Sequence, residues 1–250
     1  AIVLVHAADN HSLIGAYVAG VENEAINTNT DTNVDFYVLR ANMQGIMGGN
    51  LTGMFVLADD NFNGGAGYND ANTWYTIGAR QAGKLAGLDY RVEYYHQFGD
   101  GAVEATAAGY SGAYDNVTGS TALISSDIDR SASMVGVRVG KTFKNVQWSP
   151  TVTLWFDSLS GTDDSDAADS DHGTFNTLMD TGHKFYGLMD QYLNSRSLGT
   201  AYYGLQDFAV KTKLKLSAAN TLKVDLHHFE TQTGMDGDSD TLRTAAGQPG

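Results

Sequence analysis

The amino-acid sequence predicts an all-β fold, and within that class an antiparallel, porin-like transmembrane β-barrel. Polarity alternates with a period of two over segments of about ten residues, as in strands that cross a membrane. The connections between these segments alternate between short and long. Of the 250 residues, 42% are hydrophobic and 18% are charged; glycine occurs 29 times and proline twice. This balance suits long strands with glycine-rich turns better than a disordered chain.

Alternation is clearest in four segments: 88–98, 131–143, 205–216 and 221–230. One face of the first segment carries Leu88, Tyr90, Val92, Tyr94, His96 and Phe98, and the other carries Asp89, Arg91, Glu93, Tyr95 and Gln97. Weaker alternation marks 33–44, 50–58 and 72–83, and strands with poorer alternation are expected at 2–7, 12–21 and 149–158. The sequence therefore predicts about ten strands, as part of a larger barrel, and no long helix.

The predicted connections fall into two classes by length. Short turns are expected near 45–49, 84–87, 144–148 and 217–220, and long polar loops near 22–32, 59–71, 99–130, 159–204 and from 231 onward. Outer-membrane barrels sort their connections in this way. A large soluble β-barrel or sandwich also alternates and remains the alternative. Aromatic residues near the strand ends favour the membrane, as interface girdles: Trp74, Tyr75, Phe98, Phe143, Trp148 and Phe208.

Composition excludes several classes of protein. The chain has no cysteine, which excludes disulfide frameworks and thiol catalysis. It has no apolar run of about 18 residues, the length of a transmembrane helix. Its formal net charge of -14 argues against a nucleic-acid partner. The opening Ala1–Val5 is too short for a signal peptide, and the end at Gly250 has the composition of a loop, so we expect 1–250 to be a fragment of a single β-barrel domain.

Basic residues concentrate on the polar faces of the predicted strands, whereas most acidic residues fall in loops. The basic set on strands is Arg40, Arg80, Arg91, Arg138, Lys211, Lys213, Lys215 and Lys223, and the inward acids are Asp89, Glu93, Asp157, Asp207 and Asp225. Basic residues lining a narrow pore select for anions. The sequence therefore predicts a channel with a cationic lumen that passes anionic solutes. The alternative for any single charged residue is that it only solvates the wall of the channel and pairs with a neighbouring opposite charge. Asp207 with Lys211, or Glu93 with Arg91, could form such a pair.

The residues predicted to line the solute path are Arg40, Arg80, Arg91, Glu93, Arg138, Asp207, Lys211, Lys213, Lys223 and Asp225. A separate acidic cluster consists of Asp163, Asp164, Asp166, Asp169 and Asp171. Calcium takes about six to eight oxygen ligands, so a structural calcium ion is one hypothesis for this cluster. A solvated acidic loop without EF-hand spacing is the favoured alternative. No other cofactor is predicted.

No enzymatic motif stands out. The sequence has no HExxH pattern and no GxSxG nucleophile turn. His227 and His228 are neighbours on a predicted strand, so their side chains point to opposite faces and do not readily share a metal. We predict that the protein is not an enzyme. The alternative to a channel is a non-transporting barrel that acts as a surface adhesin or scaffold, and a barrel hydrolase is the weaker alternative.

Several segments resemble members of the alginate export family, in the same order along the chain from about residue 70 to 231. They are Leu88–Glu93, Gln97–Asp100, Phe156–Asp164, Thr174–Leu178, Gly182–Asp190, Gly204–Phe208 and Val224–Phe229. The third of these is similar to the family's aromatic-Asp-x-x-Ser-Gly-Asp strand end, except that Thr162 stands where an acid is common.

The resemblance implies a channel in the outer membrane of a bacterium, for an anionic polysaccharide such as alginate or for smaller anionic solutes. It also implies a barrel of about eighteen strands, with lipid and lipopolysaccharide around it and periplasmic export components as partners. Segment 159–204 corresponds to a long extracellular loop, which is long enough to plug or gate the lumen. Phe175, Phe185 and Tyr186 are expected either to anchor this loop to the wall or to pack against neighbouring loops.

Overall fold

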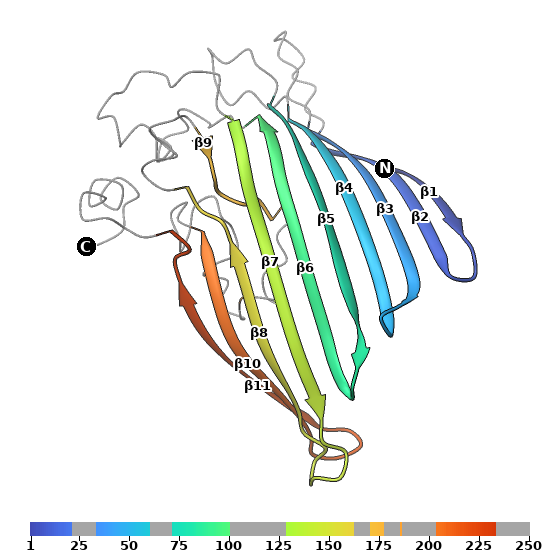
Figure 1. Cartoon of the computed structure of the whole chain (residues 1–250), viewed down its shortest axis with the longest axis vertical. Helices are drawn as coiled ribbons and strands as arrows, with labels where there is room; N and C mark the ends of the chain where they lie inside the picture. The colour runs from blue at the N-terminus through green and yellow to red at the C-terminus, as the bar shows by residue number, and fades with distance from the viewer. Residues whose placement is uncertain are drawn as a thin grey trace, which may run out of the picture.

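The computed structural model describes residues 1–21, 34–60, 72–100, 129–162, 171–177, 186 and 204–233. These residues form one sheet of antiparallel strands, with one short additional strand (Figure 1). The strands are β1 Ile2–Ala7, β2 His11–Val21, β3 Val34–Ile46, β4 Gly49–Asp60, β5 Asn72–Leu85, β6 Leu88–Asp100, β7 Asp129–Thr142, β8 Thr151–Leu159, β9 Asp171–His172, β10 Leu205–Lys215 and β11 Thr221–Glu230. The all-β, antiparallel prediction is confirmed.

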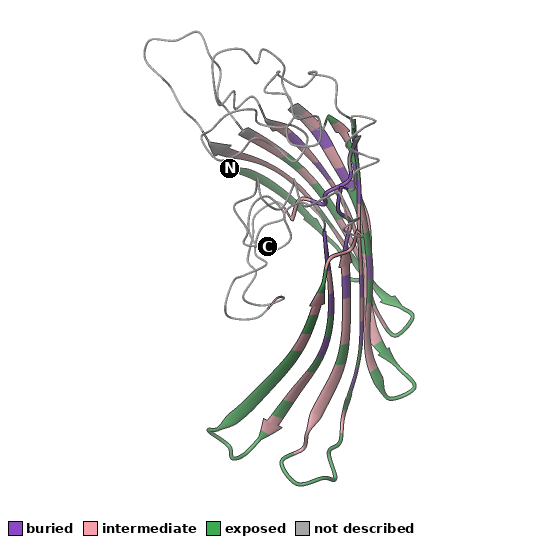
Figure 2. Ribbon diagram, turned by 90° about the vertical axis from the view of Figure 1, so that its left-hand side faces the viewer, coloured by how far each residue is buried: buried purple, intermediate pink, exposed green. Residues whose placement is uncertain are grey.

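Neighbours in the sheet follow the order of the chain, β1 to β8 and then β10 and β11. Strand β9 lies off this path and pairs with β7 in parallel. Within the described residues β1 and β11 each pair on one side, so the sheet is open, and Figure 2 shows that it is strongly bowed. No helix in the described residues is long and apolar enough to cross a membrane.

The connections at one end of the sheet are tight. Two of them are two-residue turns, Met47-Gly48 between β3 and β4 and Ala86-Gly87 between β5 and β6. All four turn residues have positive φ, at 47° and 74° in the first turn and 51° and 79° in the second. This pattern is the type I′ turn, whose twist matches the right-handed twist of the flanking strands. We call this end of the sheet the short-turn end.

The two faces of the sheet differ in the way that the alternation predicts. One face, here the outer face, exposes large apolar side chains such as Leu39 (49%), Val92 (48%) and Leu154 (60%). The other, here the inner face, buries polar and charged side chains, among them Glu93 and Asp207. Register places the two sets on opposite sides of every pair of strands from β2 to β11. Transmembrane β-barrels have the same arrangement, with an apolar outer surface and polar groups inside.

Candidate functional site

Register brings the residues predicted for the solute path to the inner face. Arg80 lies directly opposite Glu93, and Arg91 opposite Arg138. Further along the sheet, Lys211 pairs with Asp225 and Lys213 with Lys223. Arg40 and Asp207 belong to the same face of β3 and β10. The structure thus gathers these side chains on one surface, and their part in transport stays a prediction.

Arg138 is the centre of a buried charge network on β6, β7 and β8. Its Nη1 donates to Oε1 of Glu93 at 2.7 Å, and its Nη2 lies 3.0 and 3.1 Å from the two carboxylate oxygens of Asp157. Arg91 donates from Nη2 to the other oxygen of Glu93 at 2.6 Å. Two guanidinium groups therefore neutralise two carboxylates. The structure thus contains the ion pair between Glu93 and Arg91 that the sequence analysis considered as an alternative role for these residues.

Gly136 makes room for this network. It lies opposite Glu93 on one side and Asp157 on the other. A Cβ at position 136 would meet the Glu93 side chain at 2.8 Å and Oδ1 of Asp157 at 2.9 Å. These distances are shorter than real Cβ contacts, so a larger residue would push the carboxylates apart.

Trp155 joins the network to Lys211. Its indole N–H donates to Oδ2 of Asp157 at 2.8 Å. The guanidinium carbon of Arg138 lies 3.5 Å from the ring centroid, and the Lys211 ammonium lies 4.0 Å from it. Because a ring face attracts cations, Trp155 holds these two positive groups near each other. Lys211 also forms an ion pair with Asp225 at 4.0 Å.

Asp207 binds His227 instead of the Lys211 considered from sequence. The Nδ1 atom of His227 lies 2.9 and 3.0 Å from the two carboxylate oxygens. Its Nε2 atom is buried and has no hydrogen-bond partner in the described residues. His228 faces the other side and contacts Glu230 at 2.9 Å. No group of metal-binding side chains occurs in the described residues.

Several cations of the inner face have no acidic partner among the described residues. Lys84 is paired with Asp89, and the acids of the network are all engaged. Within the described part of the chain no ion pair involves Arg40, Arg80, Lys213, Lys215 or Lys223. The positive excess of the inner face therefore comes from these residues, not from Arg91 and Arg138.

Residues 171–177, here called the inner strap, lie against the inner face. Gln97 on β6 is fully buried, and its amide clamps Asn176: Nε2 donates to the Asn176 carbonyl at 2.7 Å, and Oε1 accepts from the Asn176 N–H at 2.8 Å. The hydroxyl of Ser160 donates to the Gly173 carbonyl at 2.6 Å and accepts from the Ser133 N–H at 2.7 Å. The Thr162 hydroxyl accepts from the Gly173 N–H at 3.0 Å. Both ends of the strap are thus bonded to the wall.

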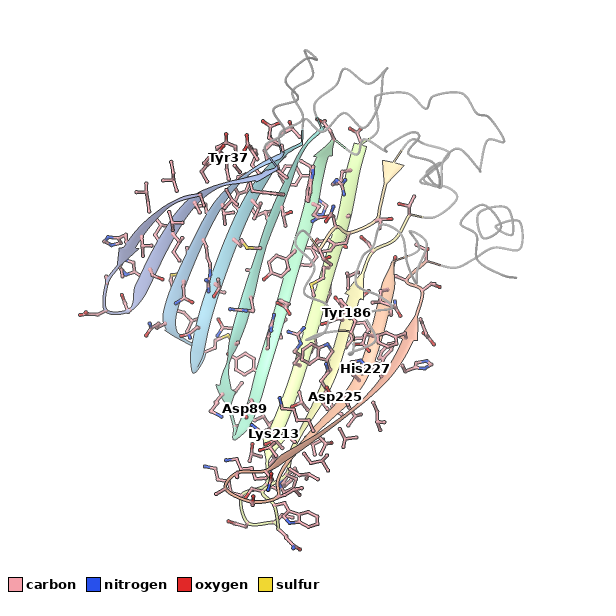
Figure 3. All side chains as sticks on the ribbon, turned by 180° about the vertical axis from the view of Figure 1, so that it is seen from behind. Tyr37, Asp89, Tyr186, Lys213, Asp225 and His227 are labelled. Atoms are coloured by element: carbon pink, nitrogen blue, oxygen red, sulfur yellow. The ribbon has the colours of Figure 1, made fainter. Side chains whose placement is uncertain are left out.

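Apolar packing completes this attachment. Phe175 of the strap is 7% exposed and belongs to a cluster with Ala132, Leu159 and Leu205. Tyr186 packs against the same cluster, and in the view of Figure 3 it lies above His227 and Asp225, which both belong to β11. Burial raises the pKa of the Tyr186 phenol, and the charge of Asp157 raises it further, so the phenol stays protonated. Part of the 159–204 segment therefore folds onto the wall.

Sequence reasoning did not select Trp155, Gln97 or His227 for the site. Gln97 lies an even number of residues from Arg91 on β6, and His227 lies two residues from Asp225 on β11, so alternation was enough to place these two side chains inward. Alternation is poorer in the strand that carries Trp155 and gave no clear signal there. Phe185 lies outside the described residues, as do Asp163, Asp164, Asp166 and Asp169, and the structure describes no side chain for Asp171. The calcium hypothesis therefore stays a prediction.

Comparison with known proteins gives one finding. The family model described as "Alginate export" matches residues 6–250, which confirms the resemblance and extends it over nearly the whole chain. No curated protein and no solved structure matches the chain. The family is one of outer-membrane transporters and not of enzymes, in agreement with the function expected from sequence.

Proposed function

Because the chain belongs to the alginate export family, we propose that it forms an outer-membrane channel whose cationic lumen passes anionic solutes, an alginate-like polysaccharide among them. The observation that supports the proposal most strongly is the set of basic side chains on the inner face that form no ion pair within the part of the chain that the structure describes. In a narrow, low-dielectric passage such a set raises the local concentration of anions. Lipopolysaccharide would surround the outer face, and periplasmic export components would deliver the solute.

The open sheet fits this proposal as an arc of a barrel. Backbone N–H and C=O groups in lipid must be paired, so an uncovered edge strand is not tolerated there. We propose that β1 and β11 pair with further strands or with each other when the protein is in the membrane. The inner strap would narrow the passage on the side of β6 and β7 and leave the lysines of β10 and β11 open.

Ion selectivity tests the proposal. In planar bilayers under a KCl gradient, the reversal potential should show chloride preference. Changing Arg40, Arg80, Lys213, Lys215 and Lys223 together to glutamine should remove most of this preference. Changing Lys141 to glutamine should leave the preference unchanged, because Lys141 lies outside the inner face, above the Phe143 ring. A cation preference that survives removal of the acidic loops would contradict the proposal, and a protein that conducts nothing would be better described as an adhesin or scaffold.

Contact of the outer face with lipid can be tested separately. Val92 is exposed near the middle of β6, on the outer face. Changing Val92 to arginine should make folding into a bilayer less favourable by about 2–4 kcal/mol, the cost of a cation near the bilayer midplane. Changing Ser12, which faces inward opposite Asn42, to arginine should cost little. Urea titrations in lipid vesicles measure both values, and equal costs would argue against lipid at the outer face.

A further inference from the structure

The inner face is not uniformly basic along the strands. Around β6, β7 and β8 the arginines are matched by Glu93 and Asp157. Toward the short-turn end of β10 and β11 the inner face carries Lys213, Lys215 and Lys223, all exposed. Figure 3 shows Lys213 below Asp225, which in turn lies below His227 and Tyr186. The free positive charge on these two strands is therefore concentrated near the short turn that joins them.

The pairing of Lys213 with Lys223 places two positive charges directly opposite each other, which is electrostatically unfavourable. The two residues are direct cross-strand partners, and side chains in that relation have Cβ atoms about 5 Å apart. Like charges at this separation repel, and no ion pair in the described residues relieves them. Lys215, two residues along the same face, adds a third cation. An anion between these ammonium groups would convert the repulsion into attraction.

We infer that Lys213, Lys215 and Lys223 form a capture site for the carboxylates of an anionic polymer, which enters the channel from the short-turn end. The inference rests on the proposed function, since it needs the inner face to be a lumen. Short turns lie on the periplasmic side of outer-membrane barrels, so the site faces the compartment that would supply the polymer. The carboxylates of Asp207 and Asp225 higher on the same strands are already bound, to His227 and Lys211.

The acidic composition of the connections at the other end of the strands also favours entry of the polymer from the short-turn end. The long connections there hold many acidic residues, including those from Asp163 to Asp171. These connections are acidic overall in sequence, so they would repel a polyanion that approaches from that side. One that approaches from the short turns meets the three lysines first. Attraction by such a patch raises association rates and weakens with ionic strength.

The experiment measures how often a polymer blocks the channel from each side. Full-length protein in planar bilayers is exposed to a linear oligogalacturonate on one side or the other, with an uncharged malto-oligosaccharide of equal length as the probe without carboxylates. The orientation of the channel in the bilayer is determined with proteins that carry Ala218→Cys. The chain has no other cysteine, and position 218 lies in the turn between β10 and β11. A membrane-impermeant thiol reagent then identifies the short-turn side.

In the parent channel, block by oligogalacturonate should be more frequent from the short-turn side. The double variant Lys213→Gln with Lys223→Gln should lower that frequency about tenfold and leave block from the other side unchanged. The double variant with arginine at both positions should retain the parent's frequency, and Lys141→Gln, on the outer face, should change nothing. The uncharged sugar should show no preference for a side.

The outcomes separate this inference from the proposed function. A parent channel that prefers anions but is blocked equally from both sides would overturn the capture site and leave the channel proposal standing. Equal losses on the two sides in the glutamine variant would do the same. A parent without anion preference would overturn the proposed function itself. Heat-modifiable mobility on gels checks that each variant folds, and the difference between the two sides of the parent channel still tests the inference if the glutamine variant does not fold.

Discussion

Changing Arg138 to methionine is expected to lower the free energy of unfolding by about 3–5 kcal/mol, the usual cost of removing one partner from a buried ion pair. Glu93 is 3% exposed and Asp157 is fully buried, so neither carboxylate can exchange the lost guanidinium for water. Arg91 remains bonded to Glu93, whereas Asp157 keeps only the Trp155 N–H among the bonds described above. Urea titration of protein in lipid vesicles, followed by tryptophan fluorescence, measures the change.

Two further variants test the cause. Changing Asp157 to asparagine in the Arg138→Met protein removes the carboxylate that has lost its cation, and most of the lost stability should return. Changing Arg80 to methionine removes an inner-face cation that has no ion pair in the described residues, and should alter stability by about 0.5 kcal/mol or less. If the double variant, Arg138→Met with Asp157→Asn, were no more stable than Arg138→Met alone, loss of packing against Trp155 would explain the effect better than charge.

Changing Gln97 to leucine is expected to release the inner strap from the wall. Leucine fills a similar volume but cannot bond Asn176, whose N–H and C=O would lose the partners that they have now. Leaving such groups unpaired costs about 2 kcal/mol, and 1.4 kcal/mol corresponds to a factor of about ten in an opening equilibrium. Amide exchange in 173–177 should therefore accelerate roughly thirtyfold.

Hydrogen-exchange mass spectrometry of the peptide covering the strap measures this change. The matched control is Gln81→Leu, since Gln81 lies on the outer face and bonds the Ile46 carbonyl and the Tyr90 hydroxyl, away from the strap. Exchange in the strap should stay at the parent's rate in the control. Unchanged exchange in Gln97→Leu would mean that the Phe175 cluster alone holds the segment.

Much of the sheet could be predicted from sequence because strand alternation has a local cause. Lipid on one side and polar surroundings on the other select opposite residue types at successive positions, so β11 and β1 were predicted with their observed bounds. Other boundaries differ by a few residues. Strand β6 extends to Asp100, two residues beyond the predicted end, because Asp100 pairs with Asp129 despite its charge. Hydrogen bonding between strands can continue where alternation no longer gives a signal.

The partners of the inner charges were harder to predict. Alternation gives the face of a side chain but not its cross-strand neighbour, which depends on register between distant segments. Glu93 and Arg91 are two residues apart, so their pair was visible in sequence; Arg138 and Asp157 come from separate strands and were not seen as a pair. Strand β9 has two residues and pairs in parallel, too short for any periodic signal. The inner strap likewise depends on long-range contacts such as that of Gln97 with Asn176.

The two-residue turns at Met47-Gly48 and Ala86-Gly87 have a consequence for how faithfully the protein folds. A turn of this length and handedness permits one alignment of the strands that it joins. A slip of a single residue would reverse the orientation of a whole strand, so Arg80 and Lys84 would enter hydrocarbon while Ile77 and Ala79 faced water. The geometry of these two hairpins therefore helps to decide which side chains of β3 to β6 face hydrocarbon and which face the polar side.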